Sequence, residues 1–221
     1  NVLGIIPPCK NIGVNGRLNL SYSPEHHDFR CKVIEFLEEH KSDAPALNCQ
    51  DDLEWQKLLI ENGFAGREIP AEYGGYGAKS DVLKSRIIVD EFVNAGVSLG
   101  LGGAGILMLI PTLLLMGSEK QKKKFIGPTL RGEIEWCQGY SEPNAGSDLA
   151  SLRTHAVLEG DEWVVNGQKT WTSLAHTADW MFCLVRTEPD APKHKGISFL
   201  LFSMDSPGIE VRPLVDMTGD A

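Results

Sequence analysis

The character of the sequence changes near Glu133, and this change limits the folds that the chain can form. Before it, apolar residues such as Phe29, Val33 and Leu37 recur at helical spacing. After it, short apolar runs are separated by turn-forming residues such as Asn166-Gly167. Helices followed by regular short strands predict an α+β multidomain chain: an N-terminal all-α domain and then an antiparallel β-barrel-like domain.

This change also suggests domain boundaries. We expect an irregular N-terminal arm over residues 1–22, a helical domain over 23–132 and a β domain over 133–221. The final residues show no convincing terminal element, so we expect the β domain to be truncated.

Two helix starts carry local capping signals. Ser23-Pro24 combines a hydroxyl N-cap with proline at the first helical position, and Ser118 with Gln121 starts another short helix. Between them, Ile106–Met116 is almost entirely apolar, which predicts a buried helix. The preceding Gly100–Gly105 stretch matches GxGxxG, but no apolar strand precedes it, so we reject a dinucleotide site there.

The predicted strands of the second domain are short and separated by turns. They cover residues 135–140, 153–158, 162–165, 168–171, 180–185, 197–202 and 209–212.

Composition excludes several classes of protein. The formal net charge of −9 argues against a nucleic-acid binder. The five cysteines are scattered without a CxxC pair, which favours a reducing compartment and no structural zinc. No apolar run is long enough for a transmembrane segment, so we expect a soluble intracellular protein.

Two segments of the β domain together suggest a cofactor site. Trp136–Asp148 begins as an apolar strand and ends in small residues whose backbone N–H groups can surround a phosphate. Asn166–Ser173 begins with a hairpin signal and continues into Trp171, Thr172 and Ser173, an aromatic ring beside two hydroxyls. The combination predicts a planar, phosphorylated cofactor.

Each residue also has a plainer interpretation. Trp171 alone is more often a core residue, Ser147 can simply cap a turn, and Glu142 can fix its loop as readily as act in catalysis. No catalytic acid–base pair, nucleophilic triad or metal cluster is apparent, so we name no catalytic or metal-binding residue.

Taken together, these motifs resemble the acyl-CoA dehydrogenase family. Residues 141–148, SEPNAGSD, match the family's Thr-Glu-Pro-x-x-Gly-Ser-Asp loop, and residues 166–173 match its Asn-Gly-x-Lys…Trp motif. The IPAEYGG loop at residues 69–75 is also similar to the family. Ser141 and Ser173 stand where threonine is commoner, and both keep the hydroxyl.

The resemblance implies FAD as cofactor. Gln138, Tyr140 and Ser141 would contact the flavin, as would Thr172. Ser147 would bind the FAD pyrophosphate and the pantetheine arm of the substrate.

Trp171 would pack against the flavin ring, and Ser173 would lie near flavin N5. Hydrogen bonds from such residues tune the flavin, while hydride transfer is the chemistry of the cofactor.

The implied reaction is FAD-dependent α,β-dehydrogenation of an acyl-CoA in lipid and fatty acid metabolism. The family's catalytic base is a glutamate of a C-terminal helical domain, which we expect to be absent from these residues. The resemblance also implies an electron-transfer flavoprotein as electron acceptor and a homo- or heterotetrameric assembly. It implies a cytoplasmic location, with the mitochondrial matrix as an alternative. Two other functions stay open: a non-catalytic subunit or fragment that supplies half a site to a partner, and an acyl-CoA oxidase. Acyl chain length is not determined by these motifs.

Overall fold

The computed structural model describes residues 22–49, 52–214 and 217. The chain divides into two compact units, one of Asn1–Pro70 with Gly75–Gly100 and the other of Ala71–Gly74 with Leu101–Ala221. The expected division near residue 132 stays a prediction, and most of the expected N-terminal arm, residues 1–21, lies outside the described residues.

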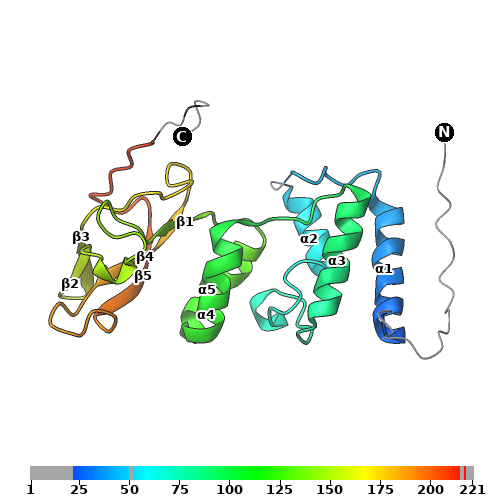
Figure 1. The fold of residues 1–221 in the computed structure, drawn as a ribbon, viewed down its shortest axis with the longest axis horizontal. Helices are drawn as coiled ribbons and strands as arrows, with labels where there is room; N and C mark the ends of the chain where they lie inside the picture. The colour runs from blue at the N-terminus through cyan, green and yellow to red at the C-terminus, as the bar shows by residue number, and fades with distance from the viewer. Residues whose placement is uncertain (1–21, 50–51, 215–216, 218–221) are drawn as a thin grey trace. The chain divides into compact units, whose positions relative to one another are not determined.

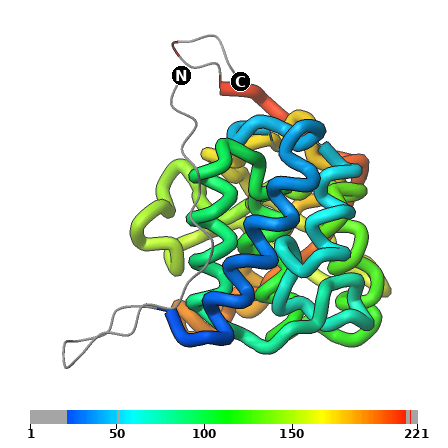
Figure 2. The backbone as a smooth tube through the Cα atoms, turned by 90° about the vertical axis from the view of Figure 1, so that its right-hand side faces the viewer, coloured from blue at the N-terminus to red at the C-terminus, as the bar shows by residue number. Residues whose placement is uncertain are grey.

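The described residues of the first unit form three α-helices around one apolar core. They are α1 (Pro24–His40), α2 (Leu53–Glu61) and α3 (Val82–Ala95), and α1 packs alongside α3 (Figure 1; Figure 2). Ser23 caps α1 as predicted by accepting the backbone N–H of His26. The buried core residues are Val33, Phe36, Leu37, Trp55, Leu59, Ile87, Ile88, Phe92 and Val97.

The second unit begins its helical part with the short 3-10 helix η1 (Ala71–Tyr73) and the π-helix η2 (Gly105–Leu109). These are followed by α4 (Ile110–Met116) and α5 (Glu119–Leu130). The predicted helix start at Ser118 is confirmed, and the structure adds that Ser118 and Gln121 exchange hydrogen bonds there in a capping box.

The expectation that residues 106–116 are buried is only partly correct. Leu109, Ile110 and Leu113 are buried, whereas Leu107 and Leu115 are 71% and 81% exposed. An apolar helix buries only the face that meets a neighbour, here chiefly α5.

The rest of the second unit is a five-stranded mixed sheet. Its strands are β1 (Trp136–Gly139), β2 (His155–Glu159), β3 (Glu162–Asn166), β4 (Trp180–Arg186) and β5 (Ile197–Ser203), with the 3-10 helix η3 (Leu149–Ser151) before β2 (Figure 1). Helices followed by a β domain confirm the predicted fold class.

The strand pairing differs from that of the antiparallel barrel-like domain that the sequence predicted. β1 and β2 each pair parallel to β4, β2–β3 and β4–β5 are antiparallel, and the sheet stays open. β4 is therefore the central strand, and its residues Phe182, Cys183 and Val185 are almost completely buried.

Two predicted strands are wrong. Residues 168–171 and 209–212 have no regular secondary structure and belong to no strand. A strand needs a partner, and in the described sheet neither segment has one.

In the described part of the chain, every helix is too short or too polar to cross a lipid bilayer.

Candidate functional site

The first candidate segment follows β1, whose position is fixed by aromatic packing. Trp136 is buried against Phe125 and Trp180, with ring centroids 5.3 and 5.8 Å away. Its indole N–H donates to the Thr129 hydroxyl of α5 at 2.8 Å. β1 is thereby joined to the helical part of the same unit, and its end projects into the following loop.

The candidate residues of β1 and the loop after it are only partly covered. Gln138 is half-buried, with its Nε2 3.0 Å from the sulfur of Met108. Tyr140 is half-buried with its ring edge-on to Phe182 at 5.8 Å, and burial raises the pKa of its phenol. Both residues keep surface that a ligand can cover.

The loop after β1 is closed by a tight turn. The backbone groups of Glu142 and Ala145 exchange hydrogen bonds of 2.9 and 3.0 Å. Beyond the turn, an added Cβ at Gly146 would meet nothing within 4 Å, and the next residue, Ser147, is exposed. The small residues therefore leave an open surface, as the predicted phosphate site requires.

Ser147 lies at a shallow pocket. The pocket is lined by Ser147, Asp148, Leu149, Ala150, Leu184, His194 and Ile197. Asp148, one of these residues, forms an ion pair with Lys193, with Nζ and Oδ2 2.6 Å apart. Ser147 is thus exposed at a concave surface that also includes the Asp148 carboxylate.

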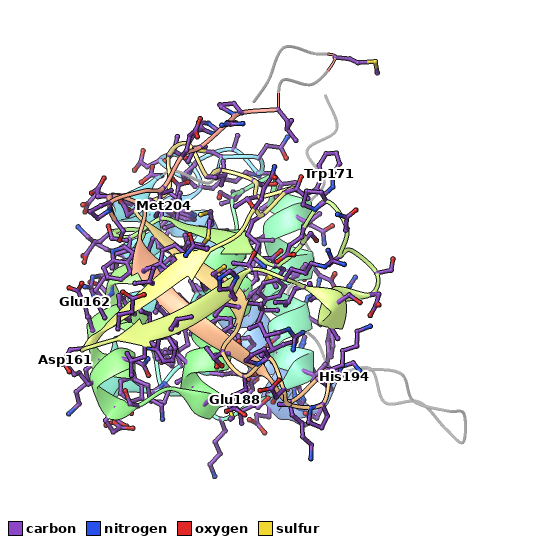
Figure 3. The ribbon with its side chains drawn as sticks, turned by 90° about the vertical axis from the view of Figure 1, so that its left-hand side faces the viewer. Asp161, Glu162, Trp171, Glu188, His194 and Met204 are labelled. Atoms are coloured by element: carbon purple, nitrogen blue, oxygen red, sulfur yellow. The ribbon has the colours of Figure 1, made fainter. Side chains whose placement is uncertain are left out.

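The second candidate segment has a strained backbone. Trp171 has φ of +57° and Leu174 has φ of +62°, in the left-handed region that residues other than glycine seldom occupy. The Trp171 side chain is nonetheless 78% exposed, so it gains little from burial. Figure 3 shows Trp171 at the opposite margin of the view from Asp161, in the turn between β2 and β3, and Glu162, the first residue of β3.

Beside Trp171 lies a buried hydroxyl with no partner. The Oγ1 atom of Thr172 is buried and makes no hydrogen bond within the described protein, whereas Ser173 is exposed. A buried polar atom without a partner is costly unless a ligand satisfies it. An exposed indole held in a strained conformation next to this hydroxyl fits a planar ligand with polar edges, as a flavin is.

The two segments are joined by hydrogen bonds. The Thr170 N–H donates to the Ser141 carbonyl at 2.9 Å, and the Lys169 ammonium donates to the Tyr140 carbonyl at 3.1 Å. These contacts hold Tyr140 and Ser141 against Lys169 and Thr170, the residues that directly precede Trp171. Ser147 is placed instead at the separate shallow pocket.

Glu142 is the buried centre of these contacts, and the sequence alone did not identify its partners. Its carboxylate accepts the backbone N–H groups of Arg153 and Thr154, both at 2.8 Å, and the Lys169 ammonium at 2.9 Å. Burial alone would raise the pKa of Glu142, but hydrogen bonds from Thr154, Arg153 and Lys169 outweigh it and lower the pKa to about 2. Glu142 is therefore ionised at neutral pH, and its contacts support the loop-fixing interpretation.

Across the described residues, no group of His, Cys, Asp and Glu side chains gathers in a way that could hold a metal ion.

Comparison with known proteins gives a consistent assignment. Residues 23–133 match the profile of the acyl-CoA dehydrogenase N-terminal domain, and residues 137–220 match that of the middle domain. The chain is 44% identical over 168 residues to the acyl-CoA dehydrogenase IpdE1 of Mycobacterium tuberculosis, a match that covers 76% of this chain and 43% of that protein.

Solved structures agree. The steroid ACAD Tcur3481–Tcur3483 has a TM-score of 0.69 at 34% identity, covering 92% of this chain and 54% of that one. The ChsE4–ChsE5 complex of Mycobacterium tuberculosis has a TM-score of 0.68 at 33% identity, covering 92% and 52%. The chain thus spans about half the length of the relatives that it matches. The two domain profiles match in their usual order and cover nearly the whole described chain. The protein therefore belongs to the acyl-CoA dehydrogenase family.

Proposed function

We propose that this chain provides the N-terminal helical and middle β domains of a FAD-dependent acyl-CoA dehydrogenase. The reaction is α,β-dehydrogenation of an acyl-CoA thioester to the trans-2-enoyl-CoA. The observation that carries the proposal is the exposed, strained Trp171 beside the unpartnered Thr172 hydroxyl. Both features raise the free energy of the protein alone, and a flavin that contacts the indole and hydrogen-bonds to the hydroxyl would offset this.

The residues of the site have distinct proposed roles. Trp171 covers one face of the flavin, while Thr172 and Ser173 bind its polar edge. Gln138, Tyr140 and Ser141 form the neighbouring wall. When bound, FAD supplies the hydride acceptor, and these residues hold it and exclude water.

Ser147 is proposed to bind the cofactor pyrophosphate and the pantetheine arm of the substrate. Its exposure at the shallow pocket and the open space around Gly146 support this role. We assign the catalytic base, a glutamate by family resemblance, to a region outside these 221 residues, and we name no catalytic residue within them.

The proposed setting follows the relatives. IpdE1 and the ChsE4–ChsE5 complex come from a bacterium, which favours the cytoplasm over a mitochondrial matrix. An electron-transfer flavoprotein is the proposed electron acceptor. The ChsE4–ChsE5 complex contains two different chains, so a heterotetramer is proposed beside a homotetramer.

That complex also favours a second candidate function. In a heteromeric assembly, this chain would act as a subunit that contributes half of a flavin and acyl-CoA site without completing the reaction itself. Co-expression with candidate partner chains, followed by assay of each chain alone and of the complex, distinguishes the two. Activity only in the complex supports the second function.

The direct test has two stages. First, FAD fluorescence is titrated with the 221-residue chain and with a Trp171→Asn variant; weaker quenching by the variant is expected. Second, the complete protein, with any partner it requires, is titrated anaerobically with acyl-CoAs of several lengths. Bleaching of the flavin absorbance supports the proposal, and its absence with every acyl-CoA overturns it. Peroxide formation in air in place of electron transfer would identify an oxidase.

A further inference from the structure

The segment that carries Trp171 is tied to the rest of the unit by few backbone contacts. Residues 167–173 belong to no strand. In the described structure, a single backbone hydrogen bond, from Thr170 N–H to the Ser141 carbonyl, joins this segment to residues 140–142. A strained tryptophan on such a segment needs another element to hold it.

Lys169 supplies that element. Its ammonium lies 2.9 Å from the Glu142 carboxylate and 3.1 Å from the Tyr140 carbonyl. The side chains of Lys169 and Glu142 are only 9% and 8% exposed, so the pair is largely shielded from water. In this environment the charge-assisted hydrogen bonds are strong and directional.

Glu142 is itself anchored at a third point. Its carboxylate accepts the amides of Arg153 and Thr154, just before β2. The turn at Gly167 packs closely on the same place, because an added Cβ there would lie 2.3 Å from the Thr154 hydroxyl oxygen. Three chain segments therefore meet at one buried ion pair.

We propose that Lys169, anchored by Glu142, is a positioning residue that fixes the Trp171–Ser173 segment against the Tyr140–Ser141 backbone. This inference rests on the proposed function in one respect, namely that the two segments form walls of a flavin site. A buried ion pair is a poor means of adding stability, because apolar replacements often stabilise a fold equally well. It does select one geometry, since both charges must keep their partners.

The first test does not require flavin. Amide hydrogen exchange is measured by mass spectrometry on the 221-residue chain and its Lys169→Met variant, which keeps an unbranched side chain one atom shorter, removes the charge and leaves Glu142 its two backbone donors. The Thr170 amide, which donates to the Ser141 carbonyl, should exchange about tenfold faster in the variant relative to the amides of β4, as resolved in overlapping peptides that cover residues 167–173. Equal acceleration in both regions, or no change, overturns the proposal.

Two further variants guard against a general folding defect. Lys169→Arg keeps the positive charge and should restore most of the protection at residues 167–173. Arg212→Met removes an exposed ion pair with Glu210 in the same unit and should leave that protection unchanged. Failure of Lys169→Arg to restore any protection, while it folds normally, would also count against the proposal.

The second test examines the flavin. If the wild-type chain binds FAD, Lys169→Met should alter the shape of the bound flavin absorption band and weaken binding about tenfold, with Lys169→Arg intermediate. An unchanged band in a folded Lys169→Met variant overturns the link to the flavin. If the wild-type chain binds no FAD even with its partners, the proposed function fails, while the exchange experiment still decides whether Lys169 positions the segment.

Discussion

Trp136 donates its indole N–H to the hydroxyl of Thr129, and both side chains are only 3% exposed. The bond joins the end of α5 to β1, the strand that leads into the candidate site. Gly105 packs against the same pair, since an added Cβ would lie 2.8 Å from Thr129 Cγ2 and 2.9 Å from Trp136 Cδ1. The space around this bond is therefore filled.

Replacing Thr129 by valine should destabilise the protein by about 1–3 kcal/mol, because it leaves the buried indole N–H without an acceptor. Urea denaturation followed by tryptophan fluorescence measures the loss. Thr129→Ser keeps the hydroxyl and should cost less than the valine variant. No loss in the valine variant beside a clear loss in the serine variant would show that packing of the methyl group, and not the hydrogen bond, matters here.

Glu142 should make stability depend on pH in the acid range. Its pKa is about 2 in the folded protein against an ordinary value of 4.5, so the unfolded chain takes up the proton first as the pH falls. The contribution, roughly 3 kcal/mol at neutral pH, should be complete above about pH 4.5 and be lost progressively toward pH 2.

Urea midpoints between about pH 7 and pH 3 test this dependence. Glu142→Gln should be less stable at neutral pH because it leaves the Lys169 ammonium buried without its counter-charge. It should also show a shallower fall in acid. If the urea midpoints of the wild type and of Glu142→Gln fall equally steeply with pH, the lowered pKa of Glu142 is contradicted.

Trp171 should be replaceable without loss of stability in the flavin-free protein. Its side chain is 78% exposed, and its φ of +57° is tolerated better by asparagine than by most residues. Trp171→Asn should be as stable as the wild type or more stable by up to about 1 kcal/mol. Trp171→Val, with a branched side chain at the same φ, should be less stable. A marked loss in the asparagine variant would show that the indole contributes to folding.

The two cysteines of the sheet should resist alkylation. Cys137 and Cys183 are at most 1% exposed, and burial raises the pKa of each thiol to about 11. At about pH 8, iodoacetamide should label them at least about a hundredfold more slowly in the folded chain than in urea. Peptide mass spectrometry after timed quenching gives both rates. Rapid labelling of either thiol in the native protein would show local opening of the sheet.

The sequence predicted best those features whose causes are local. Ser23 caps α1 and Ser118 with Gln121 caps α5, because each cap needs only residues within one helical turn. Five of the predicted strands are present because their apolar runs end at strong turn formers.

Features that depend on distant residues were not predictable in the same way. The parallel pairing of β1 with β4 leaves no mark on either strand, and residues 168–171 look like a strand but have no partner in the described sheet. Within the site, the sequence draws attention to Glu142 but does not single out Lys169 as its partner, although both lie inside the two motifs. The positive φ of Trp171 has no sequence signal at all, because tryptophan seldom adopts it.

The parallel pairing of β1 with β4 has a consequence for the order of folding. The chain between these strands contains β2, β3 and both motifs of the candidate site. A helix can form from neighbouring residues, but β1 and β4 can meet only after this whole stretch has been closed into a loop, which is entropically slow. The site should therefore form late in folding. A nascent chain whose β4 residues are still inside the ribosome should have folded helices but no surface able to bind the cofactor.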